Sequence, residues 1–324
     1  MAPLPTRPPG YAWRPATTGD AAALAAVSAA CLPLDGGYPT VESEFRTELG
    51  DPADDPAHDT VVAVGPDGTI AAYGFVHLPP GDLTERRAFP WGAVHPGHRR
   101  RGVGTALMGW LDARAEERLR AGGGPAVIRV EADEGRSDVV RLFERLGYSP
   151  ARFFTEMARD LRRPLPASPA PPGIEVRAWS DDLTEVARGV HNQAFADHWG
   201  SQPWTAEAWR RSLDEFFFRD ASAVAFDGDR PVAYLVAAVY PHDAGHRGRK
   251  EGWIERLGTV RSHRRRGVAS ALVGRAMTVF AGRGLDAALL GVDADNPTGA
   301  AGLYRRLGFE VDRRSITYLR RLDD

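Results

Sequence analysis

The six residues HRRRGV occur twice in the chain, at residues 98–103 and again at 263–268. Each copy follows an apolar segment and precedes a stretch whose apolar residues recur with helical spacing. This order predicts a strand, a glycine-bearing turn and then the beginning of a helix. The unpaired backbone N–H groups at a helix N-terminus, together with the helix macrodipole, favour an anion at that turn.

Both turns carry a glycine where a bound anion would lie. Gly102 and Gly267 let a bulky anion approach the backbone, because no Cβ stands in the way. The arginines before each glycine add fork-shaped charged donors around the same place. An isolated triple arginine is more often a solvated surface run. The same order of strand, turn and helix found twice favours a phosphate site in each copy.

The glycine pattern argues against two common nucleotide-binding loops. The dinucleotide fingerprint requires three spaced glycines, and the phosphate loop of NTPases requires Gly-Lys followed by Ser or Thr. Neither pattern occurs at these turns. Dinucleotides and ATP are therefore less favoured than another phosphate-bearing ligand.

The signals around the two turns follow one order in both halves of the chain. A hairpin of two β-rich runs comes first, and a strand then leads into the turn and its helix. A second buried strand and a helix that stops at a glycine follow. The matched segments are the hairpins 61–78 and 223–240, the strands 91–94 and 253–260, the buried strands 126–132 and 287–294, and the glycines Gly147 and Gly308. Two ordered sets of signals at nearly equal separation predict a duplicated α/β domain.

A proline-rich stretch separates the two halves. Its sequence, PLPASPAPPG at residues 164–173, favours an extended chain that joins neither a helix nor a sheet ladder. At 324 residues the chain is about twice the usual size of one domain. We therefore expect an N-terminal domain at residues 1–163, a linker at 164–173 and a C-terminal domain at 174–324.

The composition is that of an ordinary globular protein. The chain has 41 Lys and Arg against 43 Asp and Glu, so its net charge is −2 and offers no global attraction to nucleic acid or to an anionic membrane. The single cysteine, Cys31, excludes an internal disulfide. No stretch approaches the roughly 18 apolar residues of a membrane helix, and the N-terminus does not resemble a signal peptide. We expect a cytoplasmic protein with neither a nucleic-acid nor a membrane partner.

Residues 99–104 and 264–269 are similar to the Arg/Gln-x-x-Gly-x-Gly/Ala signature of the GNAT superfamily of acyl-CoA-dependent N-acetyltransferases, as are the LGY and LGF endings of the later helices. The resemblance implies an α/β (α+β) fold of two tandem GNAT domains. Each would be a mixed, mostly antiparallel twisted sheet with splayed central parallel strands flanked by helices. The pantetheine arm of acetyl-CoA, the cosubstrate, would lie between strands 253–260 and 287–294. The tandem arrangement also resembles that of the mycothiol synthases.

By the same resemblance, contacts to coenzyme A fall on the turn, on the end of the preceding strand and on the first helical residues. In the C-terminal copy these residues are Thr259, Val260, Arg264, Arg265, Arg266, Gly267, Val268, Ala269, Ser270 and Asn296. In the N-terminal copy they are Arg99, Arg100, Arg101, Gly102, Val103, Gly104 and Thr105. The N-terminal turn is intact, which leaves open whether that copy also binds acetyl-CoA.

The resemblance also assigns a general acid. Tyr304 stands four residues before Gly308, where the superfamily commonly carries the tyrosine that protonates the coenzyme A sulfur. A phenol, with an ordinary pKa of about 10, is still protonated at neutral pH and is able to donate to a departing thiolate. The residue at the same place in the N-terminal half is Phe143, which has no proton to give.

Two glutamates are candidates for the base. Glu251 and Glu255 alternate with Trp253, which predicts that all three lie on one face of a strand. A partly buried carboxylate there is able to take the amine proton, although a surface salt bridge is the alternative. Relatives commonly carry their glutamate at the position of Trp253. The N-terminal strand has Ala88 and Pro90 at the matching positions, so we expect the C-terminal domain to be the catalyst and the N-terminal domain to be a degenerate copy.

The acceptor is expected to bind in the segment 190–218, because acceptor residues in this fold come from the early helices and loops. Asp197 is a candidate partner for an ammonium group, with His198 and Trp199 beside it. His191 and His198 lack the spacing and the companion ligands of a metal site, so no metal is expected.

The leading hypothesis is an acetyl-CoA-dependent N-acetyltransferase that acts on a primary amine of a small molecule by direct attack. Mycothiol synthase chemistry, aminoglycoside modification and peptide N-terminal acetylation all remain open within that class. A non-catalytic acyl-CoA sensor or scaffold is the alternative from another class, because the N-terminal copy has lost its acid.

Overall fold

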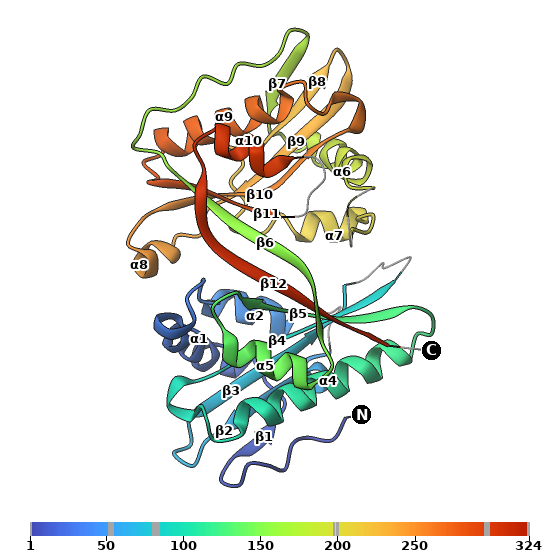
Figure 1. Cartoon of the computed structure of the whole chain (residues 1–324), viewed down its shortest axis with the longest axis vertical. Coiled ribbons are helices and arrows are strands. Elements are labelled where there is room, and N and C mark those ends of the chain that lie inside the picture. Colours follow the sequence, from blue (N-terminus) through green and yellow to red (C-terminus); the bar gives the residue numbers. More distant parts are fainter. Residues whose placement is uncertain are drawn as a thin grey trace. The chain divides into compact units, whose positions relative to one another are not determined.

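The chain divides into two compact units in the computed structural model, which describes residues 2–50, 55–79, 85–196, 198, 201–294 and 299–322 (Figure 1). Unit 1 contains residues 1–151 and 316–324, and unit 2 contains residues 152–315. Each unit has its own set of strands and its own hydrophobic core.

Unit 1 is built on a sheet with the strand order β1-β2-β3-β4-β5-β12. Its strands are β1 (Ala12–Arg14), β2 (Thr60–Val64), β3 (Ile70–His77), β4 (Arg86–Val94), β5 (Ala126–Asp133) and the part of β12 (Glu310–Leu322) from Ile316 onward. Its helices are α1 (Ala21–Asp35), α2 (Glu42–Gly50), α3 (Pro56–Asp59), α4 (Val103–Arg120) and α5 (Ser137–Arg145).

Unit 2 repeats this arrangement with the strand order β7-β8-β9-β10-β11-β6. Its strands are β7 (Ile174–Ala178), β8 (Ala223–Asp227), β9 (Arg230–Ala238), β10 (Glu251–Thr259), β11 (Ala287–Asp293) and most of β6 (Ser149–Asp160). Its helices are α6 (Leu183–Ala194), α7 (Ala206–Arg211), α8 (Asp243–Arg247), α9 (Val268–Gly282) and α10 (Ala300–Arg306).

The expected fold class is confirmed by the strand pairing. Each sheet is mostly antiparallel, with one short parallel pair at its centre. In unit 1, residues 86–88 of β4 pair with 126–128 of β5; in unit 2, residues 251–254 of β10 pair with 287–290 of β11. Beyond these residues the two strands of each pair diverge, as the splayed arrangement requires.

The core of unit 2 lies on both faces of its sheet. Helices α6 and α9 both pack against β9 and β10, and β9 is buried from Val232 to Ala238. A strand covered on both faces carries an unbroken apolar run instead of an alternating one, which explains the sequence VAYLVAA. The hairpins, the strands after them and the left-handed glycines Gly147 and Gly308 lie where the sequence predicts them.

The last strand of each half joins the unit formed by the other half. Residues 154–160 of β6, shown in green in Figure 1, pair antiparallel with β11, and Met157 is only 1% exposed in the core of unit 2. The part of β12 from Ile316 belongs to unit 1, where Tyr318 packs on Phe143. The two units thus differ from the expected division at 1–163 and 174–324, because the alternation in a strand sets its inward face and not its partner.

The proline-rich stretch at 164–173 packs on unit 2. Arg159 of β6 donates a hydrogen bond of 2.7 Å to the Pro164 carbonyl. Ser168 lies against Gly274 of α9, where a Cβ would come within 2.5 Å of the Ser168 Cβ. The segment is therefore extended, as its prolines predict, and it is held along the helix that begins at the second HRRRGV turn.

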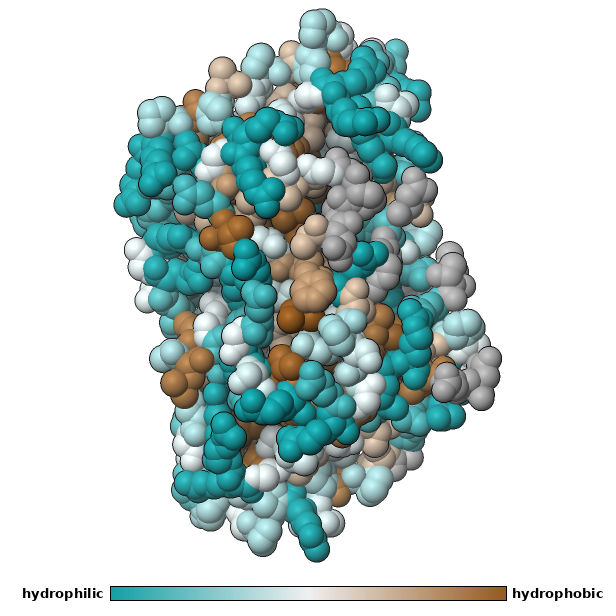
Figure 2. Space-filling model, viewed as in Figure 1, coloured by the Kyte–Doolittle hydropathy of each residue, from teal (hydrophilic) through white to brown (hydrophobic). Residues whose placement is uncertain are grey.

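Polar side chains dominate the visible surface. On the face shown in Figure 2, hydrophilic residues cover most of the area and hydrophobic ones lie in small separate groups. Among the described residues, no helix combines the length and apolar character needed to cross a membrane.

Candidate active site

A cavity of about 1050 Å³ lies in unit 2 where β10 and β11 diverge. Its walls come from α6, from β10 and the turn after it, from the first residues of α9, and from β11, α10 and the exchanged strand β6. Where β10 and β11 diverge, their backbones no longer pair, and the space between them forms part of the cavity beside the turn after β10.

The turn at 264–267 has the backbone of an anion-binding loop. Arg265 and Gly267 both adopt left-handed conformations, with φ of 61° and 87°. The first hydrogen bond of α9 runs from Ala271 N–H to the Gly267 carbonyl at 3.1 Å, so the amides of residues 268–270 have no partner within the helix. Val268, Ala269 and Ser270 all line the cavity. These donors and the positive end of the helix suit an anionic group such as a phosphate.

Arg264 ties the turn to the rest of unit 2. Its Nε donates to the Thr259 carbonyl at 3.2 Å, and its Nη2 donates to the Ala194 carbonyl at the end of α6 at 2.7 Å. The guanidinium therefore sets the shape of the turn. Arg265 lines the cavity, whereas Arg266 lies 3.9 Å from Asp227 in an ion pair outside it.

The remaining predicted coenzyme A residues are divided. Thr259 lines the cavity. Val260 is buried in the hydrophobic core and does not line it. Asn296 lies outside the described residues.

The first HRRRGV turn has nearly the same backbone as the second. Arg100 has a φ of 62° and Gly102 a φ of 85°, and Ala106 donates to the Gly102 carbonyl at 3.1 Å. Its Arg99 is bound differently, because both terminal nitrogens donate to the Asp35 carboxylate, at 2.7 and 2.6 Å. Asp35 also pairs with Arg136 at 2.5 Å. Residues 99–105, the N-terminal segment predicted to contact coenzyme A, thus keep the shape of the loop, and the Asp35 carboxylate lies beside it.

Tyr304 lies in the wall of the cavity. The side chain comes from α10 and is 7% exposed. Burial raises its pKa to about 12, so the phenol stays protonated across the physiological range. No described residue hydrogen-bonds to its hydroxyl. In unit 1 the equivalent Phe143 packs between Tyr148 and Tyr318, and it fills space with no donor.

Glu255 also lines the cavity, at an irregularity in β10. The register with β9 shifts between Ile254 and Arg256, so Glu255 is the extra residue of a β-bulge. Solvent reaches this side chain, yet the protein around it restricts the water and raises the pKa of the carboxyl. The Tyr240 hydroxyl donates to Oε1 at 3.1 Å and opposes that rise.

Glu251 lies at the other end of β10, away from the cavity. It is 2% exposed and forms ion pairs with Arg247 and Arg249. The bulge breaks the simple alternation that the sequence suggests for Glu251, Trp253 and Glu255, and only Glu255 among them lines the cavity.

The acceptor side of the cavity is formed by α6 and the residues after it. His198, one of the three predicted acceptor-binding residues, lines the cavity; Asp197 and Trp199 lie outside the described residues. The sequence analysis missed Arg256 and His191, which also line it. His191 falls in the segment expected to bind the acceptor, and Arg256 directly follows the proposed base, so position alone was the available signal.

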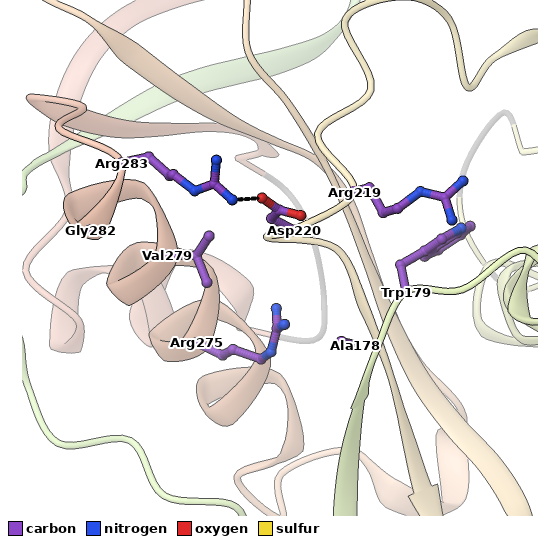
Figure 3. Close-up of a pocket in the computed structure, with 8 residues that line it drawn as sticks. All are labelled: Ala178, Trp179, Arg219, Asp220, Arg275, Val279, Gly282 and Arg283. Carbon is purple, nitrogen blue, oxygen red and sulfur yellow. Dashed lines mark hydrogen bonds and ion pairs between the residues drawn. The ribbon is translucent and has the colours of Figure 1, made fainter.

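A second hollow of about 470 Å³ lies elsewhere in unit 2, between the end of β7 and the last turns of α9 (Figure 3). Its arginines are mostly neutralised. Arg283 pairs with Asp220, as Figure 3 shows, and Arg219 pairs with Asp181. Arg275 donates to the Ala221 carbonyl at 3.1 Å. The hollow contains none of the predicted catalytic residues.

Comparison with known proteins agrees with this geometry. Over 308 residues the chain is 33% identical to a mycothiol acetyltransferase from Geodermatophilus obscurus, covering 93% of this chain and 94% of that protein. It is 30% identical over 307 residues to a mycothiol acetyltransferase from Thermobispora bispora, covering 94% and 97% of the two chains.

Solved structures share the fold over nearly the whole chain. A GCN5-related N-acetyltransferase from Sphaerobacter thermophilus is 30% identical, with a TM-score of 0.77 over 98% of this chain and 97% of that one. A tandem GNAT protein from the clavulanic acid biosynthesis pathway has a TM-score of 0.69 at 16% identity, over 97% and 100% of the two chains. The model of the acetyltransferase (GNAT) family matches residues 29–148 and again 184–309. The chain therefore belongs to the acetyltransferase (GNAT) family, with one copy of the family's domain in each half of its sequence.

Proposed function

We propose that unit 2 acetylates the primary amine of a small molecule by direct attack of the amine on acetyl-CoA. The observation that carries this proposal is that Glu255, Tyr304 and the anion-binding turn all line one cavity. In unit 1 the matching residues are Pro90 and Phe143, which carry neither a carboxylate nor a hydroxyl. Unit 1 is a degenerate copy in this proposal.

Acetyl-CoA, when bound, supplies an acetyl group activated as a thioester. Glu255 takes a proton from the attacking amine, directly or through a water, so that the nitrogen lone pair is free to form the new C–N bond. Tyr304 donates a hydrogen bond to the sulfur and passes its proton there as the C–S bond breaks. The second proton, which the nitrogen loses as the amide forms, returns to the Tyr304 phenolate through water. The products are an amide and the free thiol, and no covalent enzyme intermediate is required.

The base has to be Glu255 because Trp253 stands at the position where relatives commonly carry their glutamate. The protein around Glu255 restricts its hydration and raises its pKa, which makes it a stronger base than a fully hydrated carboxylate. The amide nitrogens of residues 268–270 hold the pyrophosphate, and the rigid turn clamped by Arg264 keeps those donors in place.

The relatives named mycothiol acetyltransferases make the cysteinyl-glucosaminyl-inositol precursor of mycothiol one candidate acceptor, beside aminoglycosides and peptide amines. The experiment is thiol release from acetyl-CoA across a panel of amines that includes this precursor, aminoglycosides, polyamines, amino acids and short peptides. Turnover of at least one amine supports the enzyme. Tight binding of acetyl-CoA with no thiol release from any amine would instead support the sensor alternative.

A further inference from the structure

Two side chains on the acceptor side of the cavity keep N–H groups that no described residue accepts. One is His191, from α6, whose Nε2 has no hydrogen-bond partner within the described chain. The other is Arg256, from β10, whose guanidinium donates to the Ser212 hydroxyl through Nη1 and to no other described residue. Both side chains line the same cavity as Glu255. An unpaired hydrogen-bond donor in a ligand cavity indicates that the ligand carries an acceptor group at that place, because a buried donor without an acceptor is costly.

The tautomer of His191 is fixed by Tyr234. The Tyr234 hydroxyl lies 2.5 Å from Nδ1 of His191. Burial lowers the pKa of His191 to about 4 and raises the pKa of Tyr234, so the imidazole is neutral and the phenol protonated. A buried hydroxyl satisfies its proton by donating it to Nδ1, and a neutral imidazole then carries its own proton on Nε2.

The other ring nitrogen of that imidazole, Nε2, is buried and unpaired within the described chain. His191 is 6% exposed, and its Nε2 has no hydrogen-bond partner among the described residues. Tyr234, which holds Nδ1, does not line the cavity, whereas His191 does. The stacked Phe195 ring, with its centroid 4.6 Å from that of the imidazole, keeps the imidazole in place. His191 is thus a side chain in the cavity wall whose ring is fixed and whose buried Nε2 carries a proton that no described residue accepts.

Arg256 is held without an acidic partner. Its guanidinium lies 4.8 Å from the ring centroid of Trp204 and 5.4 Å from that of Trp209, and Nη1 donates to the Ser212 hydroxyl at 3.0 Å. Within the described residues, no carboxylate forms an ion pair with it. A guanidinium of fixed orientation with free N–H groups matches a carboxylate, which accepts two parallel hydrogen bonds.

Unit 1 keeps the structural part of this arrangement and lacks its donors. There the matching tyrosine, Tyr73, hydrogen-bonds to Ser28, whose hydroxyl also accepts the Thr40 backbone N–H. The residue equivalent to Arg256 is Trp91, which stacks on Phe75 with the two ring centroids 4.6 Å apart. The hydrogen bond between Ser28 of α1 and Tyr73 of β3 thus joins helix and strand without an imidazole or a guanidinium. Their presence in unit 2 calls for a reason other than packing.

We propose that His191 and Arg256 bind a carboxylate of the acceptor, an inference that rests on the proposed function. The substrate is then a small primary amine that also bears a carboxylate, such as an amino acid or a short peptide. Arg256 directly follows Glu255 in β10, which brings a site for the anionic group next to the base that receives the amine proton. A purely cationic acceptor such as a polyamine meets the unpaired charge of Arg256 and is disfavoured.

The test compares acceptors that differ only in this charge. A set of amino acids and dipeptides, each paired with its carboxamide, is acetylated by the full-length enzyme, and kcat/KM is measured from the acetylated product by mass spectrometry. We expect each carboxylate to be preferred over its amide by about 10-fold or more. Arg256→Met, which keeps an unbranched side chain against the tryptophans, removes this preference, and Arg256→Lys keeps part of it.

Arg210→Gln is the matched control, because Arg210 is an exposed arginine on α7 outside the cavity; it leaves the preference unchanged. Acetyl-CoA binding and the melting temperature of each variant separate a lost subsite from a lost fold. Equal turnover within the pairs, or faster turnover of polyamines or of cysteinyl-glucosaminyl-inositol, overturns this subsite and leaves the proposed function standing. Binding of acetyl-CoA without acetylation of any amine overturns the proposed function, and the subsite with it.

Discussion

Tyr304 is the residue whose chemistry separates an enzyme from a binding protein. We expect Tyr304→Phe to reduce kcat by about 100-fold or more, the usual contribution of a general acid, because the phenyl ring fills the same space without a proton. The affinity for acetyl-CoA should change little, since the side chain does not belong to the turn. Steady-state kinetics and calorimetric binding of acetyl-CoA check both parts. Full activity in this variant removes Tyr304 from the mechanism.

Glu255 predicts a specific pH dependence. Its carboxylate has to be ionised to accept a proton, and burial raises its pKa above the ordinary 4.5. The acid limb of kcat/KM from this group therefore lies above pH 4.5, and activity is lost as the pH falls through the raised pKa. The hydrogen bond from Tyr240 favours the ionised form, so removing it raises that pKa further.

Tyr240→Phe therefore moves the acid limb to higher pH, while the aromatic ring keeps its contact with Phe216. The amine titrates identically with either enzyme, so the difference between the two pH profiles reports the carboxylate alone. A limb that stays in place would show that Glu255 is not the titrating base. Glu255→Gln should abolish most of the turnover.

At the scale of elements, the two HRRRGV turns allow a matched comparison. Gly102 and Gly267 have φ of 85° and 87°, where an L-residue costs about 1–2 kcal/mol. We expect Gly267→Ala to weaken acetyl-CoA binding by about 10-fold, because the amides at the start of α9 lose their alignment. Gly102→Ala imposes the same strain on unit 1 and should leave turnover unchanged. An equal loss of kcat/KM in both variants would mean that the first turn also serves the reaction.

The sequence predicts the repeated elements well because each has a local cause. Hairpin turns, helical spacing and left-handed glycines such as Gly147 are fixed by neighbouring residues. The bulge at Glu255 is not visible in the same way, because the alternation in KEGWIERLG suits a regular strand equally well. The hydrogen bonds from Arg264 to the Thr259 and Ala194 carbonyls are not predictable from the sequence either. Triple arginines usually lie at the surface, and Ala194 is 70 residues away from Arg264.

For the whole molecule, the exchanged strands determine which fragments are stable. A fragment of residues 152–315 keeps β6 beside β11 and retains the buried Met157. A fragment of residues 174–324, cut at the proline-rich stretch, loses both and leaves the edge of β11 unpaired. We expect the first fragment to be folded and to bind acetyl-CoA, and the second to aggregate or unfold. Circular dichroism, size-exclusion chromatography and calorimetry distinguish these results; equal stability of the two fragments would contradict the exchange.

The exchange also sets an order for biosynthesis. A ribosome completes residues 1–151 long before it reaches Ile316, so the edge of β5 in the nascent first half stays uncovered until β12 is translated. A chain that ends before Ile316 lacks the strand that completes unit 1. Such truncated products expose a pairing edge and become targets for chaperones and proteases, so the exchange makes unit 1 depend on synthesis of the second half.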